Sequence, residues 1–431
     1  MEVLEVVVLQ KKVSKILKNS FGNVIEWYDF CLFGYFASVI GTSFFSTQSK
    51  FVSILLAFAT FAIGFLARPI GGFIFGWLGD KIGRYYSMNL SIIMMGGATF
   101  LVSFLPSYHS IGIWAPILLV IIRIIQGLSA GGQFSSLIVV TSEDKNLKNT
   151  GFYTGIALSV SVLGFLLASA VSYIVMNILP QEWIHYTWRV CFAIGGLLLV
   201  FYFCSIYDEI KASSLIEKKE SRETKENKNT FKELWLKHKF KFTVSVFLSG
   251  VVCIIFYLDF VYFITFFTRH SHISQDRILI LNTVVLAIAC TLYPIFGYVS
   301  DKIGRAKLAM YGIVIHILLL PFIFKLILSN NISSIYIGML VMTVLICIIQ
   351  SAATPIFSEI FPKKVRSSGC CASYGLGAAI SGFAPMVATE VTHHNVHNIV
   401  YLFAITLVVG LLCVIPIVYD NRKQITTLDK L

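Results

Sequence analysis

The chain has 431 residues, of which 57% are hydrophobic and 13% charged, with a formal net charge of +12. Soluble proteins carry about 25% charged residues, and a single hydrophobic core stops growing at about 300 residues, so this composition argues against a soluble globular protein. The nine cysteines show no paired spacing and lie mostly in apolar stretches, which argues against a disulfide scaffold or a metal site.

Apolar stretches of about 20 residues, long enough to cross a bilayer as helices, recur along almost the whole sequence. We therefore predict an all-α polytopic membrane protein with twelve transmembrane helices. The predicted spans cover residues 19–45, 51–78, 87–105, 111–135, 151–178, 188–207, 241–267, 278–299, 307–328, 333–352, 368–391 and 398–419.

The 34 lysines and arginines set the orientation of these spans. If both termini lie on one side of the membrane, most of the basic residues lie on that side, and only a few, such as Lys50 and Arg277, lie on the other. Basic residues concentrate in cytoplasmic loops, so we expect cytoplasmic N- and C-termini. This topology accounts for the positive charge, and we expect no nucleic-acid partner.

One charged segment divides the chain. It contains KKESRETKENKN and has no apolar period, which is typical of a solvated linker. The predicted units are a cytoplasmic N-terminal segment 1–18, a six-helix half 19–207, a charged cytoplasmic linker 208–241, a second six-helix half 242–419 and a short cytoplasmic tail 420–431.

The two predicted halves repeat a short sequence. GWLGDKIGR, which contains Asp80 and Arg84, corresponds to GYVSDKIGR, which contains Asp301 and Arg305. Glycines permit a tight turn here, an Asp can accept hydrogen bonds from a helix N-terminus, and an Arg can pair with a carboxylate.

A second repeat follows the first at nearly the same separation. SEDKNLKNTG, with Glu143, corresponds to SEIFPKKVRSSG, with Glu359. Two repeats in the same order indicate a duplicated six-helix unit, which is typical of secondary transporters with a central substrate site.

The DKIGR loops resemble the signature of the major facilitator superfamily, in which this pattern helps to latch the cytoplasmic side. The resemblance implies a cytoplasmic gate formed by Asp80, Arg84, Asp301, Arg305, Glu143 and Glu359.

Longer stretches resemble one branch of that superfamily, the metabolite:proton symporters, which include proline/betaine, α-ketoglutarate, citrate and shikimate transporters. The matching stretches are GNVIEWYDFCLFGY, ARPIGGFIFGWLGDKIGR, RIIQGLSAGGQFSSL, FSEIFPKKVRSSG and LGAAISGFAPMVAT. The sequence departs from the branch at two places. Gln133 occupies a position where Glu is usual, and the acidic-Ser-Pro signature that commonly follows span six is reduced to DEIKASS. The tail after Tyr419 is too short for the coiled coil of osmosensing members, because a coiled coil needs at least three to four heptads.

Glu26 and Asp29 share one face of the first predicted span. A charge in the bilayer core costs about 2.5–3.5 kcal/mol or more, so these acids either reach water at the interface or face protein. Burial and a neighbouring like charge both favour a protonated carboxyl, and we therefore expect one of the pair to carry a coupled proton. We interpret Glu26 as ion-paired and Asp29 as coupled.

Arg68 and Arg123 are the only cations in the interior of the predicted spans, since the other basic residues lie at or near span ends. Each could pair with one of the two acids as a structural ion pair or bind a substrate carboxylate. Asp259 is a lone acid in the seventh span, and intramembrane acids are commonly functional. Tyr257 and Tyr262 flank it and could bind a quaternary ammonium by cation–π attraction, or belong to an interfacial aromatic belt.

The resemblance implies a bacterial inner-membrane symporter that takes up a small zwitterion such as proline or a betaine together with protons. The alternative substrate is a small carboxylate such as α-ketoglutarate. We find no nucleophile–base pair, metal cluster or phosphate-binding G-x-x-x-x-G-K-[ST] loop, so we expect neither an enzyme nor a cofactor. The expected partners are the substrate, protons and the lipid bilayer, and a monomer suffices.

Overall fold

The computed structural model describes the backbone of residues 20–428 except residues 21, 47–48, 83, 132, 135–137, 139–140, 142–148, 201, 203–233, 235, 271–272, 330 and 363–364. Within this part, the side chains of residues 76–88, 181, 184–185, 275–276, 367–368 and 420–428 are not described. The described residues form helices and no strands, which confirms the predicted all-α fold.

The helices of the first half of the sequence begin with Gly22–Tyr35, which is followed by α2 after a bend of 70°. The predicted span 19–45 therefore contains a bend at Phe36 that was not predicted from the sequence. The elements that follow are α2 (Ala37–Phe44), α3 (Lys50–Ile82), α4 (Arg84–Phe104), α5 (Tyr108–Ile111), α6 (Trp114–Ala130), α8 (Thr150–Ile178), the 3₁₀ helix η1 (Gln181–Tyr186) and the apolar helix Thr187–Val200.

The second half contains one helical segment that changes type in its middle. There, α11 (Lys239–Tyr257) passes through a π-helical turn, η2 (Leu258–Tyr262), into α12 (Phe263–His270). The remaining helices are α13 (Gln275–Ile303), α14 (Arg305–Ile327), α15 (Ile332–Glu359), α16 (Arg366–Ser381), α17 (Ala384–His394) and α18 (Asn398–Leu428).

Eight of the described helices are long and apolar enough to cross a membrane, or nine if the bent pair Gly22–Tyr35 and Ala37–Phe44 is one span. Three shorter apolar helices, Asn89–Phe104, Trp114–Ala130 and Thr187–Val200, accompany them. Many large apolar side chains are exposed on the outside of the helices, and that of Leu318, for example, is 73% exposed. A bilayer explains both features, because helices satisfy their own backbone groups in lipid.

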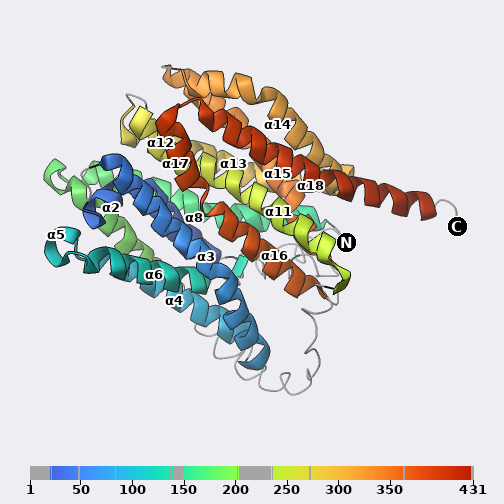
Figure 1. Cartoon of the computed structure of the whole chain (residues 1–431), viewed down its shortest axis with the longest axis horizontal. Helices are drawn as coiled ribbons and strands as arrows, with labels where there is room; N and C mark the ends of the chain where they lie inside the picture. The colour runs from blue at the N-terminus through green and yellow to red at the C-terminus, as the bar shows by residue number, and fades with distance from the viewer. Residues whose placement is uncertain are drawn as a thin grey trace, which may run out of the picture.

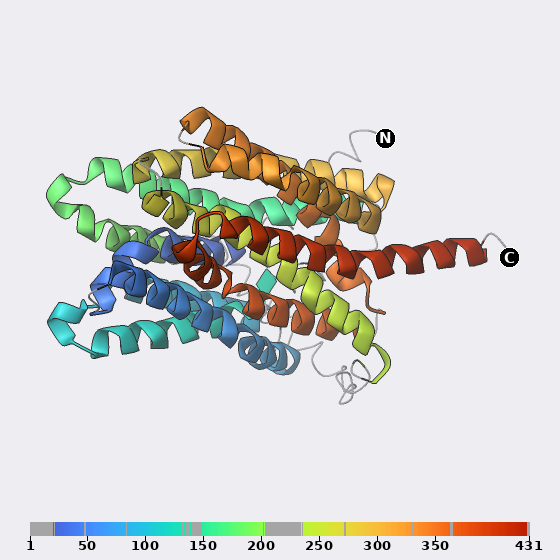
Figure 2. The same ribbon diagram turned by 45° about the horizontal axis from the view of Figure 1, so that its top comes forward.

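Figures 1 and 2 show the helices side by side along the long axis, with α3, α4 and α6 on one side and α14, α15 and α18 on the other. The two halves of the sequence meet chiefly where α8 packs against α13 and where α3 packs against α16. The α18 helix continues to Leu428 and extends beyond its neighbours (Figure 2).

Glycines bring α3 and α6 into close contact. A Cβ atom at Gly127 would collide with the backbone oxygen of Gly64, and one at Gly131 would collide with that of Arg68. Small residues allow membrane helices to approach this closely. The contact places Arg68 on α3 and Arg123 on α6 against the same face of the first helix.

Candidate functional site

The first buried ion pair joins Glu26 of the first helix to Arg68 of α3. The carboxylate oxygen Oε1 lies 3.0 Å from Nη2 of the arginine, and both side chains are almost completely buried. The Arg68 guanidinium also lies 4.1 Å from the ring centre of Phe65 and 4.5 Å from that of Phe30. Aromatic faces attract such a cation, so Arg68 is held by rings as well as by charge.

The second ion pair joins Asp29 to Arg123 of α6, with 2.7 Å between Oδ2 and Nη1. Gln126, one turn further along α6, donates a hydrogen bond of 2.6 Å to Oδ1 of the same carboxylate. Arg123 in turn lies 3.9 Å from the ring centre of Phe33. Both acids of the first helix therefore lie inside the helix bundle, with no exposed surface.

The two pairs differ in how completely they are bonded. Both oxygens of Asp29 accept hydrogen bonds, whereas neither oxygen of Glu26 has a hydrogen-bond partner among the described residues. Glu26 is thus held by charge attraction alone. Because fewer bonds oppose a change in its protonation or in its partner, Glu26 is the more easily released of the two acids.

A small cavity lies beside the Glu26–Arg68 pair, between helices from both halves of the sequence. Its lining is mainly aromatic and includes Trp27, Phe134, Phe165, Phe256, Tyr257 and Tyr374, together with the polar side chains of Ser161 and Gln350. The Arg68 guanidinium lies 5.2 Å from the ring centre of Trp27 and interacts electrostatically with Tyr257. A cation and several aromatic faces are therefore available at one place.

Contacts between α8 and α13 join the two halves near the cavity. The Ser159 hydroxyl donates a hydrogen bond of 2.6 Å to the Cys290 carbonyl. The Ser169 hydroxyl donates one of 3.0 Å to the Leu279 carbonyl. The rings of Phe51 and His393, which also belong to different halves, stack with 3.9 Å between their centres. These contacts hold the two halves together.

Asp259 and Tyr262 do not reach this cavity, whereas Tyr257 lines it. The Tyr262 hydroxyl lies 2.7 Å from the Thr392 hydroxyl and donates to the Ala388 carbonyl. Asp259 is buried in the π-helical turn η2. The structure thus brings together Glu26, Asp29, Arg68, Arg123 and Tyr257, and it places Asp259 and Tyr262 elsewhere.

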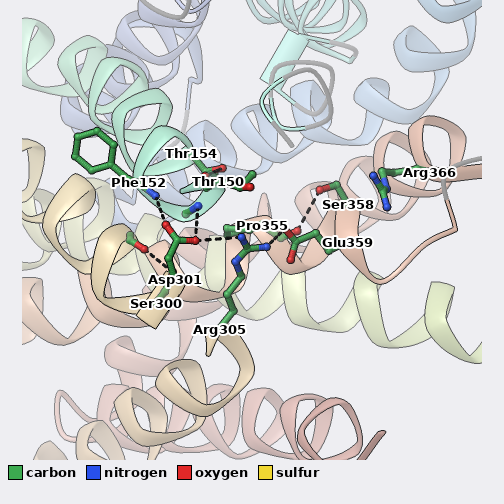
Figure 3. Close-up of polar contacts among 12 residues, drawn as sticks. Thr150, Phe152, Thr154, Ser300, Asp301, Arg305, Pro355, Ser358, Glu359 and Arg366 are labelled. Carbon is green, nitrogen blue, oxygen red and sulfur yellow. Dashed lines mark hydrogen bonds and ion pairs between the residues drawn. The ribbon is translucent and has the colours of Figure 1, made fainter. Parts of the chain in front are cut away.

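Asp301 and Arg305 form a network of polar contacts at the N-terminus of α8 (Figure 3). The Asp301 carboxylate accepts hydrogen bonds from the backbone N–H groups of Gly151, at 2.8 Å, and Phe152, at 3.0 Å. Arg305 pairs with Asp301 at 3.2 Å and also with Glu359. This network ties α8 of the first half to α13, α14 and α15 of the second.

The side chains of the corresponding residues of the first repeat lie outside the described part of the structure. The helices α3 and α4 include the backbone of Asp80 and Arg84, but their side chains are not described, and Glu143 lies in the undescribed range 142–148.

Sequence reasoning missed several contributors to the site. Gln126 lies one turn after Arg123 in RIIQG, a spacing that puts both on one helix face, and this signal was available. Gln350, Phe134 and Tyr374 carry no comparable local signal, because only the packing of the two halves brings them to the cavity. In the described part of the chain, no group of three or more His, Cys, Asp or Glu side chains could hold a metal ion.

Comparisons with known proteins agree with this architecture. The sequence pattern of the family described as "Sugar (and other) transporter" matches residues 16–424. The chain is 30% identical over 382 residues to the proline/betaine transporter of Salmonella typhimurium, covering 86% of this chain and 76% of the relative. It is 30% identical over 384 residues to the alpha-ketoglutarate permease of Escherichia coli, covering 86% and 85%.

The fold matches that of the E. coli proton:xylose symporter XylE bound to 6-bromo-6-deoxy-D-glucose, with a TM-score of 0.73 at 15% identity over 94% of this chain and 95% of that one. The predicted resemblance to the metabolite:proton symporters of the major facilitator superfamily, and to proline/betaine transporters among them, is thereby confirmed. The relatives are named as transporters and a permease rather than as enzymes, and eight of the described helices are long and apolar enough to cross a membrane. The chain therefore belongs to the sugar (and other) transporter family and is a bacterial inner-membrane transporter of the major facilitator superfamily.

Proposed function

We propose that the protein couples the uptake of a small zwitterionic metabolite, such as proline or a betaine, to the inward movement of protons. The observation that carries this proposal is the buried Glu26–Arg68 pair, which has no supporting hydrogen bonds on its carboxylate and lies beside an aromatic cavity between the two halves. The relative named as a proline/betaine transporter supports the choice of substrate.

The proposed topology has twelve transmembrane helices with both termini in the cytoplasm. Eight long apolar helices, one bent pair and three shorter apolar helices support this number, and the distribution of Lys and Arg supports the orientation. In this scheme residues 19–207 and 242–419 form the two halves, joined by the linker 208–241, with cytoplasmic segments 1–18 and 420–431.

Coupling follows from exchange of partners at Arg68. When Glu26 takes up a proton, its charge disappears and the Arg68 guanidinium is left without a counter-ion. An uncompensated buried charge is costly, so Arg68 then favours binding of a substrate carboxylate, which it can contact through two parallel hydrogen bonds. Proton and substrate therefore favour each other's binding, as symport requires.

The aromatic cavity suits the other end of a zwitterion. Trp27 and Tyr257 lie on the cavity wall beside Arg68, and aromatic faces bind quaternary ammonium groups. In this proposal Asp29 and Arg123 keep their ion pair and fix the first helix against α6. Tyr262 positions α17 through its bonds to Ala388 and Thr392.

The Asp301 network is proposed as the cytoplasmic gate. It must break for the cavity to open toward the cytoplasm, because it joins helices of both halves at one end. By sequence correspondence, Asp80, Arg84 and Glu143 are proposed to act in the same way in the first repeat.

A small carboxylate such as α-ketoglutarate is the second candidate substrate. The permease of E. coli named for that compound covers 86% of this chain, and Arg68 supplies an anchor for a carboxylate. Such a substrate would not need the aromatic wall.

Uptake by the purified full-length chain in proteoliposomes tests the proposal. We expect proline or betaine to accumulate only under an inward proton gradient, and Glu26→Gln to abolish accumulation while retaining exchange. Glu390→Gln, which removes an exposed acid of α17, serves as the control and is expected to accumulate the substrate as the unmodified protein does. Accumulation by Glu26→Gln equal to that of the unmodified protein would show that Glu26 does not carry the proton.

A further inference from the structure

Asp259 lies in an irregular part of the seventh predicted span. It is completely buried and belongs to η2, a π-helical turn between α11 and α12. Such turns are rare and occur frequently at functional sites. The helix therefore changes its hydrogen-bond pattern at the position of this buried acid.

No opposite charge accompanies Asp259. No ion pair involves it among the described residues, and its carboxyl oxygens have no well-formed hydrogen bond there, although the Thr343 side chain interacts with the carboxyl. Glu26 and Asp29, by contrast, each face an arginine. A buried carboxylate without a counter-ion is so unfavourable that the group binds a proton instead, so we expect Asp259 to be neutral in this structure.

The side chains that interact with the Asp259 carboxyl carry hydroxyl and thiol groups. They are Thr343 and Cys347 of α15 and Tyr293 of α13. From α12, Arg269 interacts with Tyr262 and lies 5.5 Å from the ring centre of Phe51. On α17, Thr392 is bonded to Tyr262.

Two polar side chains connect Asp259 with the central cavity, although not by an unbroken chain of hydrogen bonds among the described residues. Tyr293 interacts electrostatically with Asp259, and its hydroxyl donates a hydrogen bond of 2.5 Å to Oε1 of Gln350. Gln350 itself lines the cavity. These two side chains offer a route for a proton between Asp259 and water that enters the cavity.

We propose that Asp259 is a second proton-binding site, located in the second half of the molecule. The carboxyl binds a proton while the cavity is open to the outside, remains neutral in the structure described here and releases the proton to water that reaches the cavity from the cytoplasmic side. An O–H bond forms at the carboxyl on one side of the membrane and breaks on the other. This inference rests on the proposed proton symport and adds a second proton to each cycle.

Infrared spectroscopy and transport stoichiometry together test the inference on the full-length protein in liposomes. The carbonyl stretch of a protonated carboxyl is expected near neutral pH in the unmodified protein and is expected to be lost in Asp259→Asn. Because asparagine has nearly the shape of the neutral acid, this variant is expected to fold. Asp259→Glu is expected to restore the signal, and Glu390→Gln, which removes an exposed acid of α17, is expected to leave it unchanged.

The stoichiometry is read from the substrate gradient that balances an imposed pH difference with the membrane potential held at zero. One pH unit balances a substrate ratio of about 100-fold for two protons and about 10-fold for one. We expect the unmodified protein to balance about 100-fold and Asp259→Asn about 10-fold.

Two outcomes would overturn the inference while leaving proton symport in place. They are absence of the Asp259 infrared signal and an unchanged balance ratio in Asp259→Asn. If the unmodified protein shows no proton-driven accumulation of any tested substrate, the proposed function fails, and the coupling role of Asp259 fails with it.

Discussion

The Asp29–Arg123 pair provides a direct test of how buried charge stabilises this fold. At 2.7 Å and an effective dielectric constant of about 20, the attraction between the two charges is roughly 6 kcal/mol. Much of this attraction offsets the cost of removing both groups from water, and breaking a buried pair from one side typically costs about 3–5 kcal/mol. We therefore expect Asp29→Asn to lower the free energy of unfolding by about 3–5 kcal/mol.

Removing both charges should be much less harmful than removing one. In the double variant Asp29→Asn/Arg123→Met, Gln126 can still donate to the asparagine oxygen, and the methionine sulfur can pack on Phe33. Because no unpaired charge remains, we expect a favourable coupling of about 2–3 kcal/mol between the two substitutions.

Unfolding of the detergent-solubilised protein by a denaturing detergent, followed by tryptophan fluorescence, gives the required free energies for the unmodified protein, both single variants and the double variant. Glu26→Gln is the matched comparison, and we expect a smaller loss, since the Glu26 oxygens accept no hydrogen bonds among the described residues and Arg68 keeps its aromatic contacts. Additive effects of the two single substitutions at Asp29 and Arg123 would refute the reasoning.

Three further predictions concern packing, the gate and the cavity. Gly127→Val should prevent the close approach of α3 and α6 and reduce the yield of folded protein, measured by size-exclusion chromatography. The control Gly97→Ala should be tolerated, because a Cβ atom at that position meets nothing within 4 Å. Asp301→Ala should remove the two hydrogen bonds at the α8 N-terminus and lower the free energy of unfolding by about 0.5–2 kcal/mol. It should also increase maleimide labelling of Cys290 severalfold, as measured by peptide mass spectrometry, whereas the control Lys307→Gln should not. Equal labelling of the two variants would argue against a gate. Trp27→Leu should weaken betaine binding by about 0.5–2 kcal/mol but leave α-ketoglutarate binding unchanged in competition assays, and equal losses for both ligands would exclude a cation–π contact.

The sequence predicts the helices of this protein better than it predicts their partners. Apolar runs define helices because lipid leaves the backbone no other way to satisfy its hydrogen bonds. The bend at Phe36 and the π-helical turn at Asp259 were not foreseen. Gly34 lies two residues before the bend, but many glycines of this chain lie inside regular helices, and the π-helical turn contains neither proline nor glycine. The proline at position 69, by contrast, lies inside the uninterrupted helix α3.

The pairing of charges could be only partly predicted. The spacing of Glu26 and Asp29 places them on one helix face, and Arg68 and Arg123 were the available cations. Which acid meets which arginine depends on the close contact of α3 with α6, where Gly64 and Gly127 meet. That contact also explains why both acids are buried rather than interfacial.

The charges of the cavity region link substrate choice to electrical behaviour. With Glu26 and Asp29 ionised, the two ion pairs with Arg68 and Arg123 sum to zero. Protonation of Glu26 leaves one positive charge in surroundings of low dielectric constant. A bound carboxylate anion would cancel that charge, so its symport with one proton moves no net charge. A zwitterion would supply a carboxylate to Arg68, but because it has no net charge the site would still carry one positive charge. Its ammonium end would then have to lie against aromatic faces such as Trp27 rather than near another cation. Proton symport of a zwitterion therefore moves positive charge inward and is accelerated by a negative membrane interior, whereas one-proton symport of a singly charged carboxylate is not.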